Sequence, residues 1–409
     1  MFQKALFAVL GLTFSVSCFL GQTNIKVKEG IWAAGLVLND TTTLPFKLQV
    51  ANSQKSLVFT IHNAEEQIQL TRFRAIGDSF QIDFPHFHSF LRFKRINKKK
   101  ISGYWQNLNK GTNYRIPFCA NYVKKPVKND VSNLALSGKW KVVFDPRSGN
   151  PDLAQGVFNS SSEGLEGTFL TETGDFRFLS GRTDQQHFFL SCFDGSHAFY
   201  FSGDVSGEQI SNGHFYSGKH YHTDWIAHKD DAFSLRDPDS ITYLKENSAF
   251  RFSFKQTDGN TFDFPNKAFH DKVTIVQIMG TWCPNCLDEI MYFKDIYKKY
   301  HSQGLEIISI AYETPESFEK QVEIIELYKK RLNLNHLFLV GGQASKSKSS
   351  EDFSMLNEII SYPTVIFIDR GGDVVRIHTG FNGPGTGKVY QDYAEETERF
   401  IQKLLKDRP

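Results

Sequence analysis

The stretch Val273–Met279, followed by Gly280–Cys286 (GTWCPNC), decides the fold of the carboxyl-terminal part of the chain. Val273–Met279 is an almost continuous apolar run, which is typical of a strand buried on both faces of a parallel sheet. The next residues carry Ile290, Phe293 and Tyr297 at helical spacing and predict an amphipathic helix. The two cysteines of the motif therefore lie after a buried strand, in the first turn of a helix.

This position gives the two cysteines a chemistry. Unpaired amides and the dipole at the start of a helix favour the thiolate form of Cys283. A thiolate attacks a disulfide sulfur, and a second thiol three residues later resolves the mixed disulfide. We therefore expect Cys283 to be the nucleophile and Cys286 the resolving thiol. A zinc half-site would need a second Cys-x-x-Cys pair, which the chain lacks. A static disulfide at this spacing closes almost no loop and stabilises little.

Outward from the motif, residues 240–409 alternate between strand and helix patterns, which predicts an α/β domain with a mixed, mainly parallel sheet and helices on both faces. The expected strands are Phe250–Phe254, Thr261–Phe264, Val273–Met279, Leu305–Ala311, Leu337–Val340, Thr364–Asp369 and Val374–His378. Thr314-Pro315-Glu316 is expected to open a helix. A polar loop at Gly341–Ser350, a short helix ending near Ile360 and a closing helix at Glu395–Leu405 complete the pattern.

The pattern of residues 23–235 predicts an all-β region that consists of one unit repeated in tandem. Short alternating runs between turn residues are typical of sandwiches and barrels. Gly30-Ile31-Trp32 near the start of one half is repeated as Gly138-Lys139-Trp140, and Ala120 near its end as Ala227. The copies lie about 110 residues apart throughout, so we expect two tandem all-β domains, at 23–125 and 133–235, each folding by itself.

The β repeats show less chemistry. His214, His220, His222 and His228 crowd one segment, and His220 and His222 share a strand face. They are a possible metal pair, but exposed imidazoles are the favoured reading, because no carboxylate or third ligand has coordinating spacing. No metal and no other cofactor is therefore expected.

The remaining cysteines of the chain include Cys119 and Cys192, one in each repeat. They could form a disulfide after export, but their positions in the two repeats are not equivalent. Small buried apolar residues are the other reading.

The amino terminus predicts export. Lys4 precedes the apolar run Ala5–Leu20, which is shorter than the about 20 residues that a bilayer needs. We expect a cleaved signal at residues 1–21 and a periplasmic or cell-envelope location; lipidation at Cys18 is the alternative. No later stretch predicts a transmembrane span. The formal net charge is +2, so no overall field favours nucleic acid.

Residues 240–409 resemble the TlpA/ResA-type exported thiol-disulfide oxidoreductases of the thioredoxin superfamily, with a redoxin-like domain. The Trp-Cys-x-x-Cys signature carries the resemblance, and it implies a thioredoxin-like fold. Glu289 matches a family glutamate thought to move protons at the buried thiol; a solvated helix glutamate is the other reading. Tyr362-Pro363-Thr364 matches the superfamily's cis-proline segment. With Trp282 and Pro284, these three are the expected substrate-positioning residues.

The chain also departs from the family pattern. Gln277 stands where the superfamily has a buried acid, so the role of proton acceptor would pass to Glu289. Met291 replaces a helix proline, and about His336–Ile360 exceeds the minimal thioredoxin unit. The β repeats resemble extensions of TlpA-like proteins of Bacteroidetes-type bacteria, a resemblance that transfers no function.

The sequence therefore predicts an exported disulfide reductase that acts on proteins with disulfides and is rereduced by a membrane-linked thiol donor. A thiol peroxidase is a weaker alternative, because Gly280 and Val276 replace the threonine or serine and the proline of the peroxide site. Gly383–Lys388 imitates a phosphate loop, but Asn382 and Val389 break that motif. The other alternative is a binding or scaffold protein whose β repeats have the main role.

Overall fold

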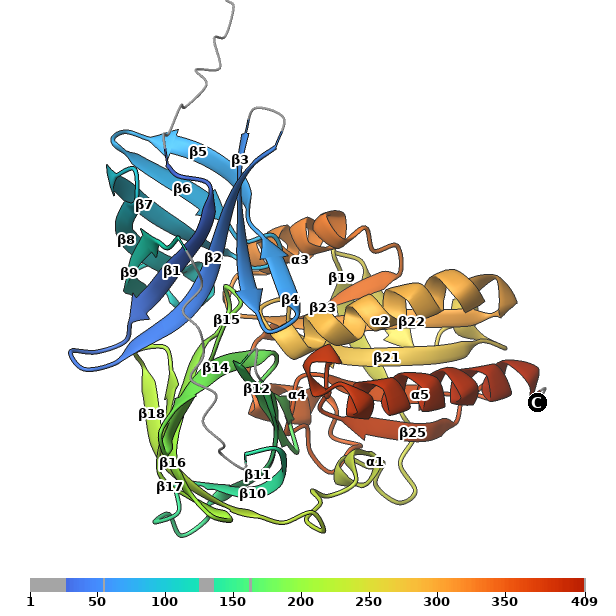
Figure 1. The fold of residues 1–409 in the computed structure, drawn as a ribbon. Helices are drawn as coiled ribbons and strands as arrows, with labels where there is room; N and C mark the ends of the chain where they lie inside the picture. Colours follow the sequence, from blue (N-terminus) through green and yellow to red (C-terminus); the bar gives the residue numbers. More distant parts are fainter. Residues whose placement is uncertain (1–26, 54–55, 125–135, 162–163, 408–409) are drawn as a thin grey trace, which may run out of the picture.

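The computed structural model describes residues 27–53, 56–124, 136–161 and 164–407 (Figure 1). The predicted signal at 1–21, with Cys18, lies outside these residues, and so does most of the predicted linker between the repeats. No helix in the described part is long and apolar enough to cross a membrane. Two β units lie beside an α/β unit (Figure 1).

The first β unit is a nine-stranded antiparallel sheet in the part of the chain that is described, with the order β4-β3-β2-β1-β9-β8-β7-β6-β5. Its strands are β1 Gly30–Val37, β2 Thr43–Ser53, β3 Ser56–Asn63, β4 Glu66–Gln69, β5 Thr71–Ile76, β6 Ser79–Asp83, β7 Ser89–Asn97, β8 Lys100–Asn107 and β9 Arg115–Tyr122. Each strand pairs with its neighbour in sequence except that β4 and β5 form the two edges of the sheet, and β1 also pairs with β9. Alternating side chains therefore form one apolar core.

The second β unit repeats this arrangement and closes on itself, because β11 pairs with both β10 and β12. Its strands are β10 Gly138–Phe144, β11 Asp152–Ser161, β12 Gly164–Thr171, β13 Gly174–Asp175, β14 Leu179–Asp184, β15 His187–Phe193, β16 Ala198–Ser206, β17 Gln209–Ser217 and β18 Tyr221–Lys229. Stacked aromatic rings fill its core; the Phe201 and Phe215 centroids are 4.3 Å apart.

The two units share the geometry that the Gly-x-Trp repeat predicts. Trp32 and Trp140 are completely buried, and each indole Nε1 donates to the carbonyl four residues earlier, at 2.9 Å and 2.8 Å. The strand pairing is equivalent as well, because Ala120 lies opposite the second residue after Trp32 and Ala227 opposite the second residue after Trp140. The two copies therefore have the same internal register, although their division into separate domains remains a proposal.

The third unit holds a seven-stranded sheet, counted over the described residues, in the order β20-β19-β23-β22-β21-β24-β25. The strands are β19 Phe252–Gln256, β20 Thr261–Phe264, β21 Val273–Met279, β22 Leu305–Glu313, β23 Leu337–Gln343, β24 Thr364–Ile368 and β25 Val374–Thr379. The helices are α1 Pro238–Ile241, α2 Pro284–Tyr300, α3 Phe318–Leu332, α4 Lys346–Asp352 and α5 Lys388–Lys406. Figure 1 shows α2 and α5 running side by side along this sheet.

The prediction of a mixed sheet is correct, but the prediction that it is mainly parallel is wrong. Only the central strands β21, β22 and β23 pair in parallel. The hairpins β19–β20 and β24–β25 add antiparallel pairs at both edges, because a short turn can join only antiparallel strands. The buried strand Val273–Met279 is the predicted one, and all of its residues are buried.

Two helix predictions also need correction. Helix α3 begins at Phe318, not at Thr314-Pro315-Glu316, because Ser317 is the N-cap and its hydroxyl accepts from the Lys320 amide. The segment Gly341–Ser350, expected to be a loop, contains the start of α4, whose N-cap is Ser345. Serine and lysine in this segment suggested a loop, but a serine cap outweighs weak helix propensity.

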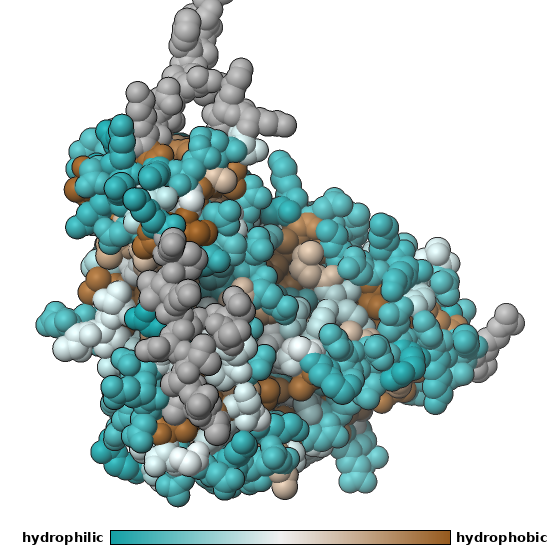
Figure 2. All heavy atoms as spheres, in the orientation of Figure 1, coloured by the Kyte–Doolittle hydropathy of each residue, from teal (hydrophilic) through white to brown (hydrophobic). Residues whose placement is uncertain are grey.

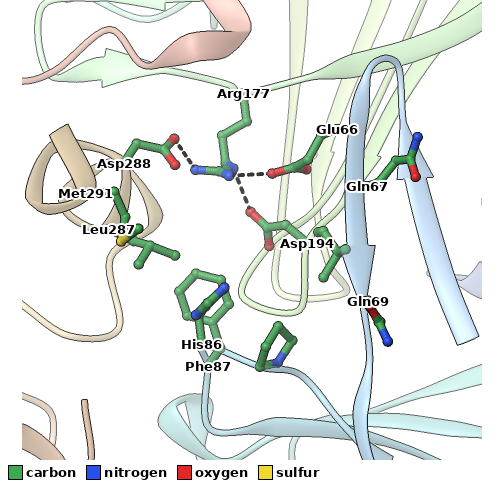
Figure 3. A pocket seen from close by; sticks show the side chains of 12 residues that line it. Glu66, Gln67, Gln69, His86, Phe87, Arg177, Asp194, Leu287, Asp288 and Met291 are labelled. Atoms are coloured by element: carbon green, nitrogen blue, oxygen red, sulfur yellow. Dashed lines mark hydrogen bonds and ion pairs between the residues drawn. The ribbon is translucent and has the colours of Figure 1, made fainter. Parts of the chain in front are cut away.

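One buried side chain, Arg177, joins the three units (Figure 3). Arg177 follows β13, and its guanidinium pairs with Glu66 of the first sheet at 2.7 Å, with Asp194 after β15 at 3.2 Å and with Asp288 of α2. Only 4% of the Arg177 side chain is exposed. Burial opposes its charge, but the three carboxylates raise the pKa of Arg177 well above its usual value. Each of the three units therefore supplies one carboxylate to the guanidinium of Arg177.

We predict that Arg177→Met lowers the free energy of unfolding by about 3–5 kcal/mol, because it leaves buried carboxylates without their cation. Arg74→Met is the matched control: Arg74 pairs with Asp83 on the surface and is 45% exposed. This control should cost at most about 1 kcal/mol. Urea unfolding measures both values, and equal losses in the two variants would contradict the role of Arg177.

Candidate active site

The two motif cysteines lie where the sequence predicts, at the start of α2. Cys283 is the N-cap residue, and its Sγ accepts from the Cys286 amide at 3.3 Å. The same thiol donates to the Tyr362 carbonyl at 3.4 Å. Both cysteines are free thiols. The start of α2 therefore directs a backbone N–H at the sulfur of Cys283.

The expected substrate-positioning residues lie around Cys283. The Tyr362–Pro363 peptide bond is cis, and the carbonyl of Tyr362 faces the thiol of Cys283. The Trp282 indole donates to the Tyr312 carbonyl at 2.9 Å, and its ring meets the Tyr362 ring edge-on with centroids 6.0 Å apart. The structure thus brings the two motifs together from distant parts of the sequence.

Two further residues of this predicted set are buried. The hydroxyl of Thr364 donates to the Ser361 carbonyl at 2.9 Å, so it holds the turn before β24. Pro284 occupies the first turn of α2, and its carbonyl accepts from Arg177 at 3.3 Å. Their roles in binding a substrate remain predictions.

Glu289 is completely buried, so the reading as a solvated helix residue is wrong. Its Oε2 accepts from the Gln277 amide at 2.7 Å, and Oε1 has no hydrogen-bond partner within the described part of the chain. Burial raises the pKa of Glu289 well above its usual value, and the neighbouring Cys283 raises it further. A buried carboxyl with a raised pKa can exchange a proton with a neighbouring thiol.

Cys286 is also completely buried. Burial raises the pKa of its thiol, and the hydrogen bond and charge of Cys283 raise it further. The charge of Glu289 acts in the same direction. Burial therefore favours the neutral thiol form of Cys286.

Sequence reasoning missed Glu313, which ends β22. Its carboxylate accepts from the Thr281 amide at 2.9 Å and from the Thr281 hydroxyl at 2.8 Å, and so fixes the turn before the motif. Burial raises the pKa of Glu313 to about 7. The sequence signal that could have found Glu313 is an acid at the end of an apolar strand. Parallel neighbours such as β21 and β22 end at the same edge of the sheet, so this acid lies near the cysteine motif that follows β21.

The second β unit also contacts the motif, which nothing in the sequence indicated. The Ser196 hydroxyl donates to the Trp282 carbonyl at 3.0 Å, and the Asn285 amide donates to the Asp175 carbonyl at 3.3 Å. Only 7% of Cys283 is exposed. The two motif cysteines therefore lie beneath loops of the preceding β unit.

A cavity of 380 Å³ opens beside these contacts, where the three units meet (Figure 3). Its lining combines apolar groups with the carboxylates around Arg177. The apolar lining includes Ile68, Phe87, Leu287 and Met291. Burial raises the pKa of Asp194, but contacts with His197 and Arg177 outweigh that effect and lower this pKa to about 2. The carboxylate of Asp194 is therefore ionised.

The histidines predicted as a possible pair are not brought together. His220 lies before β18, where its Nδ1 contacts the Tyr114 hydroxyl at 3.0 Å. His222 lies instead beside His214 and Asp224. Cys119 and Cys192 are both free thiols, and Cys192 is buried in the core of the second unit.

Comparison with known proteins agrees with this geometry. The Redoxin family model matches residues 245–393. Thiol-disulfide oxidoreductase ResA of Halalkalibacterium halodurans is 25% identical over 137 residues, which cover 32% of this chain and 66% of that protein. ResA of Bacillus thuringiensis is 24% identical over 140 residues, with 34% and 66% covered. The chain thus spans just under two thirds of these relatives. The resemblance to ResA-type proteins is confirmed; the Bacteroidetes type remains a prediction.

Solved structures include a thioredoxin-family thiol:disulfide interchange protein from Chlorobium tepidum, which is 21% identical and aligns over 40% of this chain and 99% of its own, with a TM-score of 0.29. A thiol-disulfide oxidoreductase from Bacteroides fragilis is 19% identical, with 36% and 98% covered and a TM-score of 0.28.

We predict that Glu289→Gln slows the release of product from the mixed disulfide at least about tenfold, because the amide keeps the contact with Gln277 but cannot transfer a proton. Wild type should show a pH inflection above the usual glutamate range that the variant lacks. Single-turnover rates across pH test this, with Glu306→Gln, which removes a carboxylate facing Tyr297, as the control.

A stability measurement accompanies this test. The pKa of Glu289 is higher in the folded chain than in the unfolded chain, so its ionisation costs stability as pH rises through and above the unfolded value. The Gln variant should therefore gain stability relative to wild type with rising pH. A pH-independent difference would contradict the buried, protonated state of Glu289.

Proposed function

We propose that the chain is an exported thiol-disulfide oxidoreductase that works through Cys283 and Cys286 as a disulfide reductase. The observation that carries this proposal is the position of Cys283. It is the N-cap residue of α2, and its thiol faces the carbonyl of Tyr362, just before the cis bond to Pro363. The family resemblance and the similarity to ResA proteins support the same chemistry.

The reaction begins when the Cys283 thiolate attacks one sulfur of a substrate disulfide. That S–S bond breaks, a mixed disulfide forms, and the leaving sulfur takes up a proton. Cys286 then loses its proton and attacks the Sγ of Cys283, which releases the substrate as a dithiol and leaves Cys283–Cys286 oxidised. Glu289 is the proposed carrier for the proton of the buried thiol, with Gln277 holding its carboxyl.

The proposed substrates are proteins with disulfides, and two electrons from a membrane-linked thiol donor would restore the dithiol. The support for this setting is the apolar run Ala5–Leu20, which is typical of an export signal. A periplasmic or envelope location follows from that signal and remains part of the proposal.

The β repeats support a scaffold role better than a separate binding role. Among the described residues, Tyr221 and Tyr243 are the only exposed aromatic side chains, at 48% and 56%, whereas the largest fully buried side chains are tryptophan, tyrosine and phenylalanine. The face seen in Figure 2 is mostly hydrophilic, with apolar atoms in small separate areas. A surface for capturing partners would expose a larger apolar patch.

We predict that Cys283→Ser abolishes the reduction of a model protein disulfide by the prereduced full chain, because no nucleophile remains. Cys286→Ser should instead accumulate a mixed disulfide at Cys283, because that bond is no longer resolved. Mass spectrometry after acid quenching detects this adduct, and Cys119→Ser serves as the control.

Three outcomes of this experiment contradict the proposal. Wild-type rates in Cys283→Ser would exclude the nucleophile, and the absence of an adduct in Cys286→Ser would exclude the resolving thiol. An equilibrium in which wild-type protein keeps its dithiol while the substrate stays oxidised would exclude reduction as the direction.

A further inference from the structure

We infer that the outer face of β17 and β18 is a metal site formed by His214, His222 and Asp224, which takes a divalent transition metal such as Zn²⁺. The three donor atoms lie within 4.8 Å of one another. This site lies in the second β unit and plays no part in the redox chemistry proposed above.

The strand register creates the site. His214 of β17 lies directly opposite Asp224 of β18, and His222 comes two residues before Asp224. Residues two apart share a face of a strand, and cross-strand partners are close enough for their side chains to meet. Both histidines and the aspartate therefore project from the same face of the sheet.

The distances between donor atoms fit tetrahedral coordination. His214 Nδ1 is 3.1 Å from Asp224 Oδ1, His222 Nε2 is 3.4 Å from His214 Nδ1, and His222 Nε2 is 3.9 Å from Asp224 Oδ1. A tetrahedral zinc with bonds of about 2.0–2.2 Å separates its ligands by about 3.3–3.6 Å. Two nitrogens and one oxygen are a usual zinc donor set, and the fourth position would hold water.

Hydrogen bonding alone accounts for this cluster less well. In the tautomer with the proton on His214 Nδ1, that proton can point at Asp224 Oδ1 or at His222 Nε2 but not fully at both, whereas a cation accepts a lone pair from all three atoms. Arg147 pairs with Oδ2 of Asp224 at 2.5 Å, which leaves Oδ1 as the oxygen that would bind the metal. Outer contacts of this kind orient metal ligands. The ring of Tyr216 packs against His222 at 4.4 Å.

Zinc titration of the full chain tests this site, with both motif cysteines replaced by serine so that the dithiol cannot bind metal. We expect one saturable Zn²⁺ per chain, and visible absorption typical of tetrahedral Co²⁺ on replacement. His214→Ala and His222→Ala should each weaken binding at least about tenfold. His187→Ala is the matched control, since His187 lies opposite Asp204, contacts it at 2.8 Å, and belongs to no three-donor cluster among the described residues.

Two results would overturn this inference. One is the absence of saturable Zn²⁺ binding, and the other is a dissociation constant that His214→Ala leaves unchanged. Asp224→Asn, which keeps the shape of the side chain, distinguishes a lost ligand from a disturbed strand: it should weaken binding without lowering the thermal stability of the metal-free protein.

A different set of contacts carries a second inference, which rests on the proposed function. We propose that the second β unit holds the redox pair closed, so that Cys283 reacts only after this contact opens. Thr173 and Gly174 lie against the loops that flank the cysteines. The Ser361 hydroxyl, just before the cis-proline segment, donates to the Thr173 carbonyl at 2.9 Å. The Gly383 amide donates to the Asp175 carboxylate at 2.5 Å.

Gly174 gives this closure a test. Its φ is +133°, and a Cβ at this position would lie 2.2 Å from Nδ2 of Asn285, between the two cysteines. A side chain there must displace the Asn285 amide from the carbonyls of Asp175 and Phe381, and it also lies 3.0 Å from the Phe381 carbonyl oxygen, so it loosens the contact between the β unit and the motif. Gly207 also has a positive φ, +60°, but a Cβ there would meet nothing within 4 Å. Gly207→Ala thus imposes a backbone cost on the same unit without the contact.

The measurement is the rate at which iodoacetamide alkylates Cys283 in the reduced full chain, read by peptide mass spectrometry. We expect Gly174→Ala to react at least about tenfold faster than wild type, and Gly207→Ala to react at the wild-type rate. Ser196→Ala, which removes only the contact with Trp282, should give a smaller increase and serves if Gly174→Ala fails to fold.

Unchanged alkylation in folded Gly174→Ala would overturn the closure. This readout needs no turnover, so it separates the two proposals. A chain that alkylates faster when opened but never exchanges disulfides would retain the closure and refute the proposed oxidoreductase.

Discussion

A single buried guanidinium sets the arrangement of the whole molecule. Arg177 would be costly to bury alone, and it is stable only because Glu66, Asp194 and Asp288 meet it from three separate units. The buried carboxylates in turn need a nearby cation to stay ionised. Burial, together with the negative charges of Asp175 and Glu66, raises the pKa of Asp288 to about 7. The neighbouring Arg177 lowers this pKa but does not cancel the rise. The start of the redox helix is thus tied electrostatically to both β sheets.

The cysteine site adds a second set of buried polar groups. Cys286, Glu289 and Gln277 are all buried between α2 and the central strands. Burial disfavours the charged forms of both Cys286 and Glu289. Glu313 acts differently, because its contacts with Thr281 hold the turn rather than exchange protons with sulfur. The proposed proton carrier, Glu289, and the carboxylate that holds the turn, Glu313, are therefore different groups of the same site.

The local sequence predicted the parts whose causes are local. The apolar run Val273–Met279, the cysteine spacing and the Gly-x-Trp repeat all act over a few residues, and the strands, helix start and register they indicate are present. The errors arose where local signals compete, as when Ser317 rather than Thr314 capped α3. Contacts between units were not predictable, because Arg177 and Asp288 are 111 residues apart and neither belongs to a motif.

The matching tryptophans of the two β units have a consequence for their history. Trp32 and Trp140 make the same bond in the same register, which indicates an ancestral duplication, yet the two copies now face different neighbours. Loops of the second copy cover the cysteines, while the first contributes Glu66 and Phe87 at the margin. Selection on the shared framework would act alike on both copies, but selection on the loops would act separately. The copies should therefore diverge fastest at the end that faces the redox unit.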